Sequence, residues 1–161
     1  MIIKIDTIDI IKPVFKQYLT IMNAFFDIHD FDKWSATALN NLKSYIRNTD
    51  RNIYAIKEAG HLIGFIFINK HLRFNSDGFA VAEFFIQNNH TKKGYGRYLA
   101  EFAFNRFPGH WEIAVTQKNT VAARFWKQVV SSYTQNRFSI EEKPSFNGKG
   151  FVFNNSDQQR S

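Results

Sequence analysis

One stretch of the chain constrains its fold more than any other, and it reads FAVAEFFIQNNHTKKGYGRYLAEFAF from residue 79 to residue 104. An apolar run of strand length comes first, and a polar loop with two glycines follows it. The next residues carry Tyr95, Leu99 and Phe102 at helical spacing, until Pro108-Gly109 must end the helix. The stretch therefore predicts a strand, a short loop and a helix in direct succession.

The rest of the chain predicts further strands and helices on both sides of this unit. Helical spacing begins near Pro13, which suits a first turn, and Ser35 is the expected N-cap of a second helix that ends near Asn48. Asn119 is the expected cap of the last helix, and Asn147-Gly148 is the expected turn of a final hairpin. Strands are expected at residues 1–6, 51–58, 61–71, 79–87, 111–115, 137–143 and 150–155.

This order of elements, β-α-α-β-β-β-α-β-α-β-β, predicts an α/β (mixed α+β) fold around one sheet. A length of 161 residues favours one domain, because it is enough for a real core and too short for two. We expect this domain over residues 1–155, followed by a frayed tail at residues 156–161.

The composition narrows the class of protein without identifying a ligand. The 21 Lys and Arg residues exceed the 14 Asp and Glu residues, so the formal net charge is +7. Such an excess suits nucleic acid, an anionic surface or a polyanionic cofactor. The absence of cysteine excludes disulfides, thiolate metal sites and a cysteine nucleophile. No apolar run approaches the ~18 residues of a membrane-spanning helix, and no signal peptide is evident, so we expect a cytoplasmic protein.

The loop at residues 91–96 has the features of an anion-binding site. The first turn of a helix exposes backbone N–H groups and a partial positive charge. Gly94 and Gly96 lack the Cβ atoms that would block a close approach, and they permit unusual φ angles. Three basic side chains add positive charge here: Lys92, Lys93 and Arg97. The loop is thus a candidate cradle for a diphosphate, and a plain strand-to-helix turn is the alternative.

Two spaced motifs resemble the acetyl-CoA signature of the GNAT N-acetyltransferase superfamily. That family's loop reads R/Q-x-x-G-x-G/A after its fourth strand, and Gly94 and Gly96 match the two glycines. Its second motif reads N-x-x-A-x-x-x-Y after the fifth strand. Asn119 and Ala122 match that motif, while Trp126 stands in the place of the Tyr. The resemblance covers almost the whole chain and is closest to bacterial predicted acetyltransferases of unassigned substrate.

The resemblance implies a single-domain fold with a central, mostly antiparallel sheet that is flanked by helices and splayed between its fourth and fifth strands. It also implies acetyl-CoA as co-substrate, with the pantetheine arm along the fourth strand and the diphosphate on the glycine loop. Thr91 departs from the pattern, because the family usually has Arg or Gln there. The cofactor contacts that the resemblance implies are Phe85, Ile86, Gln87, Thr91, Lys92, Lys93, Gly94, Tyr95, Gly96, Arg97, Asn119, Ala122 and Trp126.

The implied reaction is direct attack by a primary amine, on a small molecule or a peptide, at the acetyl thioester. A backbone N–H near Phe85 or Ile86 would face the carbonyl oxygen as negative charge develops on it. Glu83 is the candidate general base, because it is the only charge in an otherwise apolar strand. A structural ion pair of Glu83 with a Lys or Arg is the alternative. Trp126 cannot supply the acid that the family Tyr supplies in many relatives.

The acidic loop DIHDFD offers two candidate contacts for a cationic amine, Asp27 and Asp30. Its spacing matches no standard metal-ligand pattern, so we expect no metal. The histidines elsewhere, His61, His71, His90 and His110, are expected to be isolated and without a role. Two other functions stay open, a catalytically weak CoA-binding protein and a basic RNA-associated module of the same fold, and a homodimer stays open too.

Overall fold

The computed structural model describes residues 1–157. The helices in this part of the chain are α1 (Ile8–Phe26), α2 (Phe31–Arg47), α3 (Tyr95–Arg106) and α4 (Thr120–Thr134), with a 3-10 turn η1 (Asn88–His90). The strands are β1 (Ile2–Lys4), β2 (Asn52–Glu58), β3 (His61–Asn69), β4 (Phe79–Ile86), β5 (His110–Thr116), β6 (Ser139–Lys143) and β7 (Phe146–Asn154).

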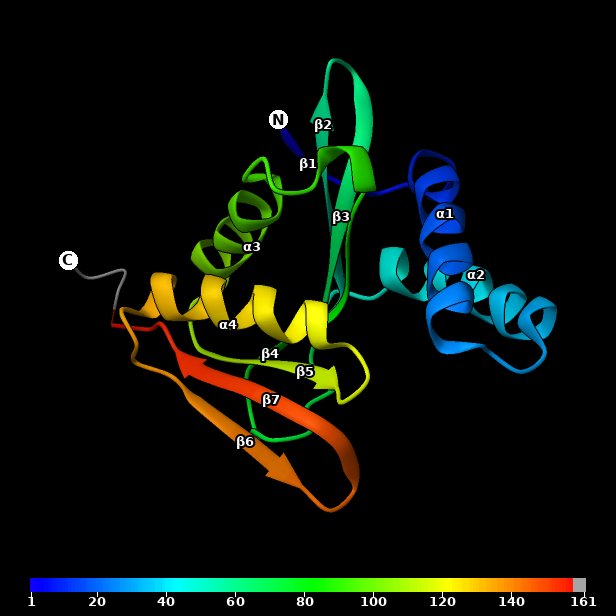
Figure 1. Ribbon diagram of the computed structural model, residues 1–161. Coiled ribbons are helices and arrows are strands. Elements are labelled where there is room, and N and C mark those ends of the chain that lie inside the picture. Colours follow the sequence, from blue (N-terminus) through cyan, green and yellow to red (C-terminus); the bar gives the residue numbers. More distant parts are fainter. Residues whose placement is uncertain (158–161) are drawn as a thin grey trace. The chain divides into compact units, whose positions relative to one another are not determined.

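The strands form a mixed, mostly antiparallel sheet in the order β1-β2-β3-β4-β5-β7-β6 (Figure 1). β4 runs parallel to β5, with Phe79 opposite Trp111 and Ala80 opposite Glu112. Both strands continue beyond these two pairs, as expected for neighbouring strands that splay apart. The α/β fold expected from the order of elements is confirmed.

The chain groups into two compact units. The first unit comprises Met1–Phe67 and Phe84–Gly96, and the second comprises Ile68–Glu83 and the residues from Arg97 onward. The expectation of one domain over residues 1–155 stays a prediction. Of the expected tail, the residues after Asp157 lie outside the described part of the chain. No helix in the described residues combines the length and the apolar character that crossing a bilayer needs.

The core of the first unit is built mainly from aromatic side chains. Phe15 of α1 packs against Phe65 and Phe67 of β3, at ring-centroid distances of 5.8 and 5.4 Å. Tyr18, on the same face of α1, meets Phe65 edge-on at 5.3 Å and Phe85 at 5.7 Å. These contacts hold α1 against the strands of its unit, and α2 lies beside α1 (Figure 1).

Helix α1 begins earlier than expected. Its first residue is Ile8, so Pro13 lies inside the helix and not in its first turn. Ile11 is fully buried and lies four residues before Phe15, so the buried face of the helix extends towards the N-terminus. The gain from burying this face outweighs the one backbone hydrogen bond that proline cannot donate.

Helix α2 also begins earlier, at Phe31. Its N-cap is Asp30, whose carboxylate accepts a hydrogen bond from the backbone N–H of Lys33 at 3.4 Å. The expected cap, Ser35, lies inside the helix. Asp and Ser are both favourable N-cap residues, and the helix begins after the one that comes first in the sequence, Asp30.

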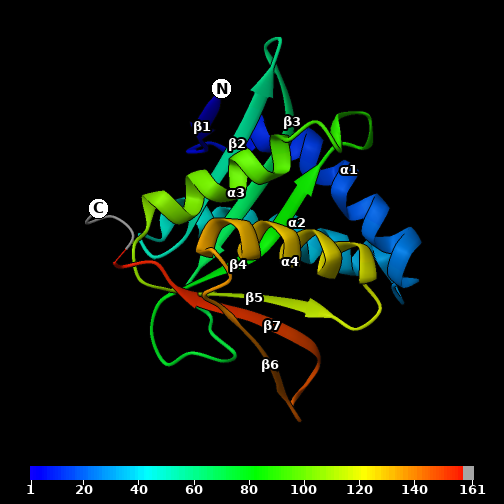
Figure 2. The same ribbon diagram turned by 60° about the vertical axis from the view of Figure 1, so that its left-hand side comes forward.

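The core of the second unit centres on Phe104 of α3. Its ring lies 5.0 Å from the rings of Trp111 and Phe153 and 6.5 Å from that of Trp126, centroid to centroid. Helix α4 packs on β5 and β7, and Figure 2 shows it lying along them. β5 and β7 pair antiparallel along the whole length of β5.

The C-terminal hairpin turns earlier than expected. The turn falls at Pro144-Ser145, and Asn147-Gly148 lies inside β7. Gly148 pairs with Thr116 in the ladder between β5 and β7. Pairing across the sheet, and not the local turn preference of Asn-Gly, therefore decides where this hairpin turns.

Candidate active site

The predicted anion-binding loop, Thr91–Gly94, is exposed and connects η1 to α3. Gly94 has a φ of +87°, and a Cβ added there would meet no atom within 4 Å. Its backbone is therefore open to a ligand. Gly96 lies inside α3, so only Gly94 uses the unusual φ expected of both glycines. The first turn of α3 carries no acidic side chain, which favours an anion there.

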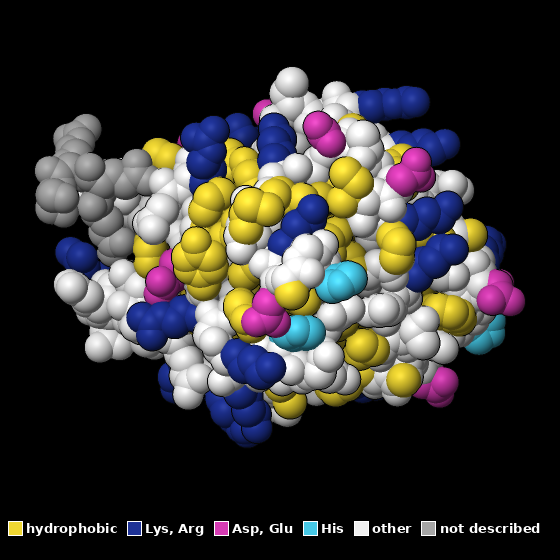
Figure 3. Space-filling view, turned by 90° about the horizontal axis from the view of Figure 1, so that it is seen from above, with side chains coloured by type: hydrophobic (Ala, Val, Ile, Leu, Met, Phe, Trp, Pro, Cys, Tyr) yellow, Lys and Arg dark blue, Asp and Glu magenta, His cyan; other side chains and the backbone are white. Residues whose placement is uncertain are grey.

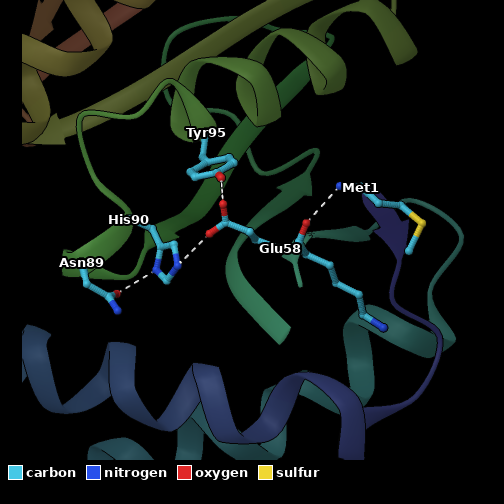
Figure 4. Close-up of polar contacts among 6 residues, drawn as sticks. Met1, Glu58, Asn89, His90 and Tyr95 are labelled. Atoms are coloured by element: carbon cyan, nitrogen blue, oxygen red, sulfur yellow. Dashed lines mark hydrogen bonds and ion pairs between the residues drawn. The ribbon is translucent and has the colours of Figure 1, made fainter. Parts of the chain in front are cut away.

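Glu58, the last residue of β2, contacts one residue on each side of this loop (Figure 4). The hydroxyl of Tyr95 donates to its Oε1, and Nε2 of His90 lies 2.9 Å from its Oε2. Nδ1 of His90 lies 2.7 Å from Oδ1 of Asn89. The expectation that His90 is isolated is therefore wrong. No short motif connects residue 58 with residues 90 and 95, so the sequence held no signal for this cluster.

The surroundings of Glu58 favour its ionised form. The hydrogen bond from Tyr95 lowers the pKa of Glu58 below its ordinary value of 4.5, as do the charges of His90 and Lys93, while desolvation acts in the opposite direction. The same hydrogen bond raises the pKa of Tyr95 above its ordinary value of 10.0. At neutral pH, Glu58 is thus a carboxylate and Tyr95 a neutral phenol, which is the pair that forms this bond.

A hollow of about 790 Å³ lies in the first unit, beside His90. It is lined by the N-terminal half of α1, by the turn between β2 and β3, and by Gln87 and His90. The side chain of Gln87, an expected cofactor contact, donates to Oε1 of Gln17 in α1 at 2.8 Å. The hollow has the size of a small-molecule site.

Strand β4 carries the expected catalytic groups. The N–H of Gln87 donates to the carbonyl of Ile63 in β3 at 2.8 Å. Because successive N–H groups of a strand point in opposite directions, the N–H of Phe85 points the same way and that of Ile86 points away from β3. Ile86 is therefore the better placed of the two expected oxyanion donors. Glu83 is half-buried on this strand, and not fully buried.

Helix α4 holds the residues of the second expected motif. The side chain of Asn119 accepts a hydrogen bond from the N–H of Ala122 at 3.0 Å, so the predicted N-cap is confirmed. Trp126 is 4% exposed and packs against Phe104. These three residues lie together along the N-terminal half of α4, within the second unit.

Arg97 is the remaining basic residue of the expected cofactor contacts, and it is already engaged. Its Nε donates to Oε1 of Glu101 at 2.7 Å, and one of its terminal nitrogens donates to Oγ of Ser132 at 2.7 Å. The bond to Glu101 lies within α3, and the bond to Ser132 joins α3 to α4. Arg97 is therefore bonded to side chains of its own unit, although it is exposed, as Lys92 and Lys93 are.

The acidic candidates for binding an amine lie at the junction of the two N-terminal helices. Asp27 ends α1 and Asp30 caps α2, and both adopt the left-handed backbone conformation, with φ of 49° and 52°. Both are exposed. In residues 1–157, no three His, Asp or Glu side chains come together in a way that could hold a metal ion.

Comparison with known proteins identifies the family of this chain. Residues 15–129 match the model of the acetyltransferase (GNAT) family. The matched span contains the glycine loop and also α4 through Val129. No protein of curated function matches the chain in sequence.

Several solved structures share the fold at low sequence identity. An N-acetyltransferase, PaiA, from Thermoplasma acidophilum in complex with coenzyme A has a TM-score of 0.66 at 15% identity, over 96% of this chain and 99% of that one. An acetyltransferase from Thermus thermophilus has a TM-score of 0.68 at 13% identity, over 96% and 97%. The aminoglycoside 6'-N-acetyltransferase AAC(6')-Ih from Acinetobacter baumannii has 0.60 at 9%, over 80% and 88%. At such identities the likeness shows the fold alone.

Proposed function

The chain belongs to the acetyltransferase (GNAT) family, and on that premise we propose that it transfers the acetyl group of acetyl-CoA to a primary amine of a small molecule or a peptide. One observation carries the proposal: the family match spans both segments expected to bind acetyl-CoA, the glycine loop and the N-terminal half of α4. Use of acetyl-CoA follows from the family. The choice of an amine as the acceptor rests on residues of this chain.

The geometry of the glycine loop supports the diphosphate of acetyl-CoA as its ligand. The loop is exposed, its backbone is open at Gly94, and the first N–H groups of α3 are natural donors to phosphate oxygens. Lys92 or Lys93 is proposed to compensate for the side-chain contact with the diphosphate that is weakened at Thr91, where the family usually has Arg or Gln. Asn119, Ala122 and Trp126 are proposed as further contacts.

In the proposed reaction, the amine nitrogen forms a bond to the carbonyl carbon of the thioester, and the carbon–sulfur bond then breaks to release CoA. Ile86 is proposed to donate its N–H to the carbonyl oxygen while that oxygen carries negative charge. Glu83 is proposed to accept the proton that an ammonium group, with a pKa near ~10, must lose before it attacks. CoA leaves as the thiolate without an acid from Trp126, because the ordinary pKa of a thiol is only ~8.5, and the proton released by the acylated nitrogen restores the thiol.

Asp27 and Asp30 are proposed to attract the cationic acceptor. Both carboxylates are exposed and close together in sequence, so a polyamine or an aminoglycoside is a suitable acceptor class to test. The direct experiment measures free CoA with DTNB across a panel of polyamines, aminoglycosides and peptides. Release of CoA that depends on one amine class supports the proposal. Binding of acetyl-CoA without turnover on any amine contradicts it and favours a CoA-binding protein without catalysis.

The glycine loop can be tested separately from turnover. Acetyl-CoA at ~100 times its Kd should add about 2.7 kcal/mol to the stability of the wild-type protein. Gly96→Glu should abolish this gain, because it places bulk and negative charge at the start of α3. Gly96→Gln is the matched control with equal bulk and no charge, and it should bind better than the Glu variant. A wild-type protein that excess acetyl-CoA does not stabilise would refute the assignment.

The charge of +7 keeps an RNA-associated module as the second candidate. Lys and Arg side chains are scattered over the face seen in Figure 3, among acidic and hydrophobic ones. A nucleic-acid-binding surface more often gathers its basic residues into a stripe. The two candidates are separated by measuring binding of RNA and of acetyl-CoA at the same ionic strength.

A further inference from the structure

The carboxylate of Glu58 spans the glycine loop. Its two oxygens bond His90, which directly precedes the loop, and Tyr95, which directly follows it. We propose that Glu58 is a positioning residue that ties the two ends of Thr91–Gly94 together and so holds the loop in the form that binds the diphosphate. This role rests on the proposed function, because it concerns the affinity of the loop for acetyl-CoA.

Glu58 is held in place by a well-packed strand. Glu58 ends β2, which pairs with β1 and buries Ile53, Ala55 and Ile56. The contact continues beyond Glu58, since His90 also meets Asn89 through its second ring nitrogen. Figure 4 shows the four side chains in series, from Asn89 through His90 and Glu58 to Tyr95. A residue of the sheet thus fixes both η1 and the first residue of α3.

The loop between the two tied residues needs such support. Its side chains are exposed, and Lys92 adopts the left-handed conformation, with φ of 61°, which is unfavourable for a residue with a Cβ. Thr91 bonds back to the carbonyl of Asn88 through its N–H and its hydroxyl, at 3.3 and 2.9 Å. Those bonds connect Thr91 only to the N-terminal side of the loop, whereas the two bonds of Glu58 link the N-terminal side to the C-terminal side.

The tie and the charge of Glu58 predict effects of opposite sign. A carboxylate near a loop that binds a polyanion repels that ligand, so charge alone predicts that removing Glu58 strengthens binding. Positioning predicts that removing it weakens binding, because the free loop must then be ordered by the ligand. The sign of the change in affinity therefore distinguishes the two.

Three variants separate the contributions. Glu58→Ala removes both bonds and the charge, Glu58→Gln removes the charge and keeps a side chain that can bond both partners, and Tyr95→Phe removes one bond and keeps the charge. Calorimetric titration with acetyl-CoA should give a Kd about tenfold weaker for Ala and about threefold weaker for Phe, with Gln much closer to wild type. At saturating acetyl-CoA, kcat of Glu58→Ala and of Glu58→Gln should stay within about twofold of wild type, because Glu58 touches no reacting atom.

Two controls complete the test. Asp6→Asn removes one negative charge from an exposed residue of the same unit and should leave the Kd unchanged. In the Glu58→Ala background, Tyr95→Phe should cost nothing more, because the bond is already lost. Equal tightening in Ala and Gln, or a Kd unchanged in Ala, would overturn the proposal.

Hydrogen exchange tests the tie without any ligand. Amides of residues 91–95 should exchange several-fold faster in Glu58→Ala than in the wild-type protein, while those of β2 keep their rates. Equal rates in the loop would overturn the proposal even if the variants alter acetyl-CoA binding. A wild-type protein that does not bind acetyl-CoA would refute the proposed function and not this tie.

Discussion

Two glutamates each hold a loop, Glu58 in the first unit and Glu112 in the second, and they do so in different ways. Glu112 of β5 is 1% exposed, and its carboxylate accepts hydrogen bonds from the backbone N–H groups of Arg73, Phe74 and Asn75 at 2.7, 3.1 and 2.9 Å. The side chain of Glu58 is 40% exposed and meets the side chains of His90 and Tyr95.

The different partners of Glu112 and Glu58 give the two carboxylates different roles. Backbone N–H groups do not titrate, and they are present whatever side chain the donor residue carries. A buried carboxylate needs several such donors to offset its lost hydration. Glu112 therefore stabilises the fold of the loop between β3 and β4. Exposed side-chain contacts add little to stability, because water competes for both partners. Glu58 therefore acts on the position of its loop and not on whether the protein folds.

The largest effect on stability should come from Glu112→Ala. The change leaves buried backbone donors without an acceptor, and we expect a loss of about 3 kcal/mol in the free energy of unfolding. Urea denaturation measures this directly. Glu112→Gln keeps the shape and one acceptor oxygen, so its loss should be smaller. A loss below about 1 kcal/mol for the Ala variant would show that the loop does not depend on this carboxylate.

The next largest effect should come from Gly150→Ala, which disturbs the same loop from β7. An added Cβ would clash with Cε2 of Phe74, so this ring must move. We expect a loss of about 1–2 kcal/mol, again from urea denaturation. The loss should shrink in a Phe74→Leu background, where the ring is absent. Equal losses in both backgrounds would mean that the ring is not the cause.

Glu58→Ala should change stability least of the three variants. Its contacts are only partly buried, so the melting temperature without ligand should stay within about 2 °C of wild type. Differential scanning fluorimetry measures this. A drop comparable to that of Glu112→Ala would remove the distinction between the two glutamates.

Titration should also test the contacts of Glu58, which the backbone donors around Glu112 cannot reproduce. The pKa of Glu58 is lowered, so its contribution is present above the ordinary value of 4.5 and is lost as the pH falls through the lowered value. The pKa of Tyr95 is raised, so its contribution is present below 10.0 and is lost as the pH rises through the raised value. Exchange of the loop amides, corrected for the intrinsic pH dependence, should therefore become faster below the first limit and above the second. NMR titration of Tyr95 in Glu58→Ala should return its pKa towards 10.0, and an unchanged pKa would exclude the bond.

Features that depend on neighbours in sequence were predicted well. Asn119 caps α4, and Pro108-Gly109 follows α3. The Ala59-Gly60 turn joins β2 to β3, with φ of 48° and 81°. The mostly antiparallel sheet flanked by helices, which the family resemblance implied, is confirmed, whereas the strand order and the parallel pair of β4 and β5 were seen only in the structure. The site residues followed from two short motifs, and their roles stay predictions.

Two of the predictions that failed did so where a distant segment competed with a local preference. Asn147-Gly148 has a strong turn preference, yet Gly148 pairs with Thr116. Pro13 suits a first turn, yet the buried Ile11 extends α1 past it.

The order of elements, the resemblance to the family and the candidate anion-binding loop could be predicted from the sequence, because each depends on residues that are close together in the chain. Only the tertiary structure decided which carboxylates hold which loops. Glu58 meets Tyr95 at a separation of 37 residues, and Glu112 meets Phe74 at 38. A hydrogen bond at such a separation forms only after the sheet has brought the two segments together, so no local pattern carries its signature.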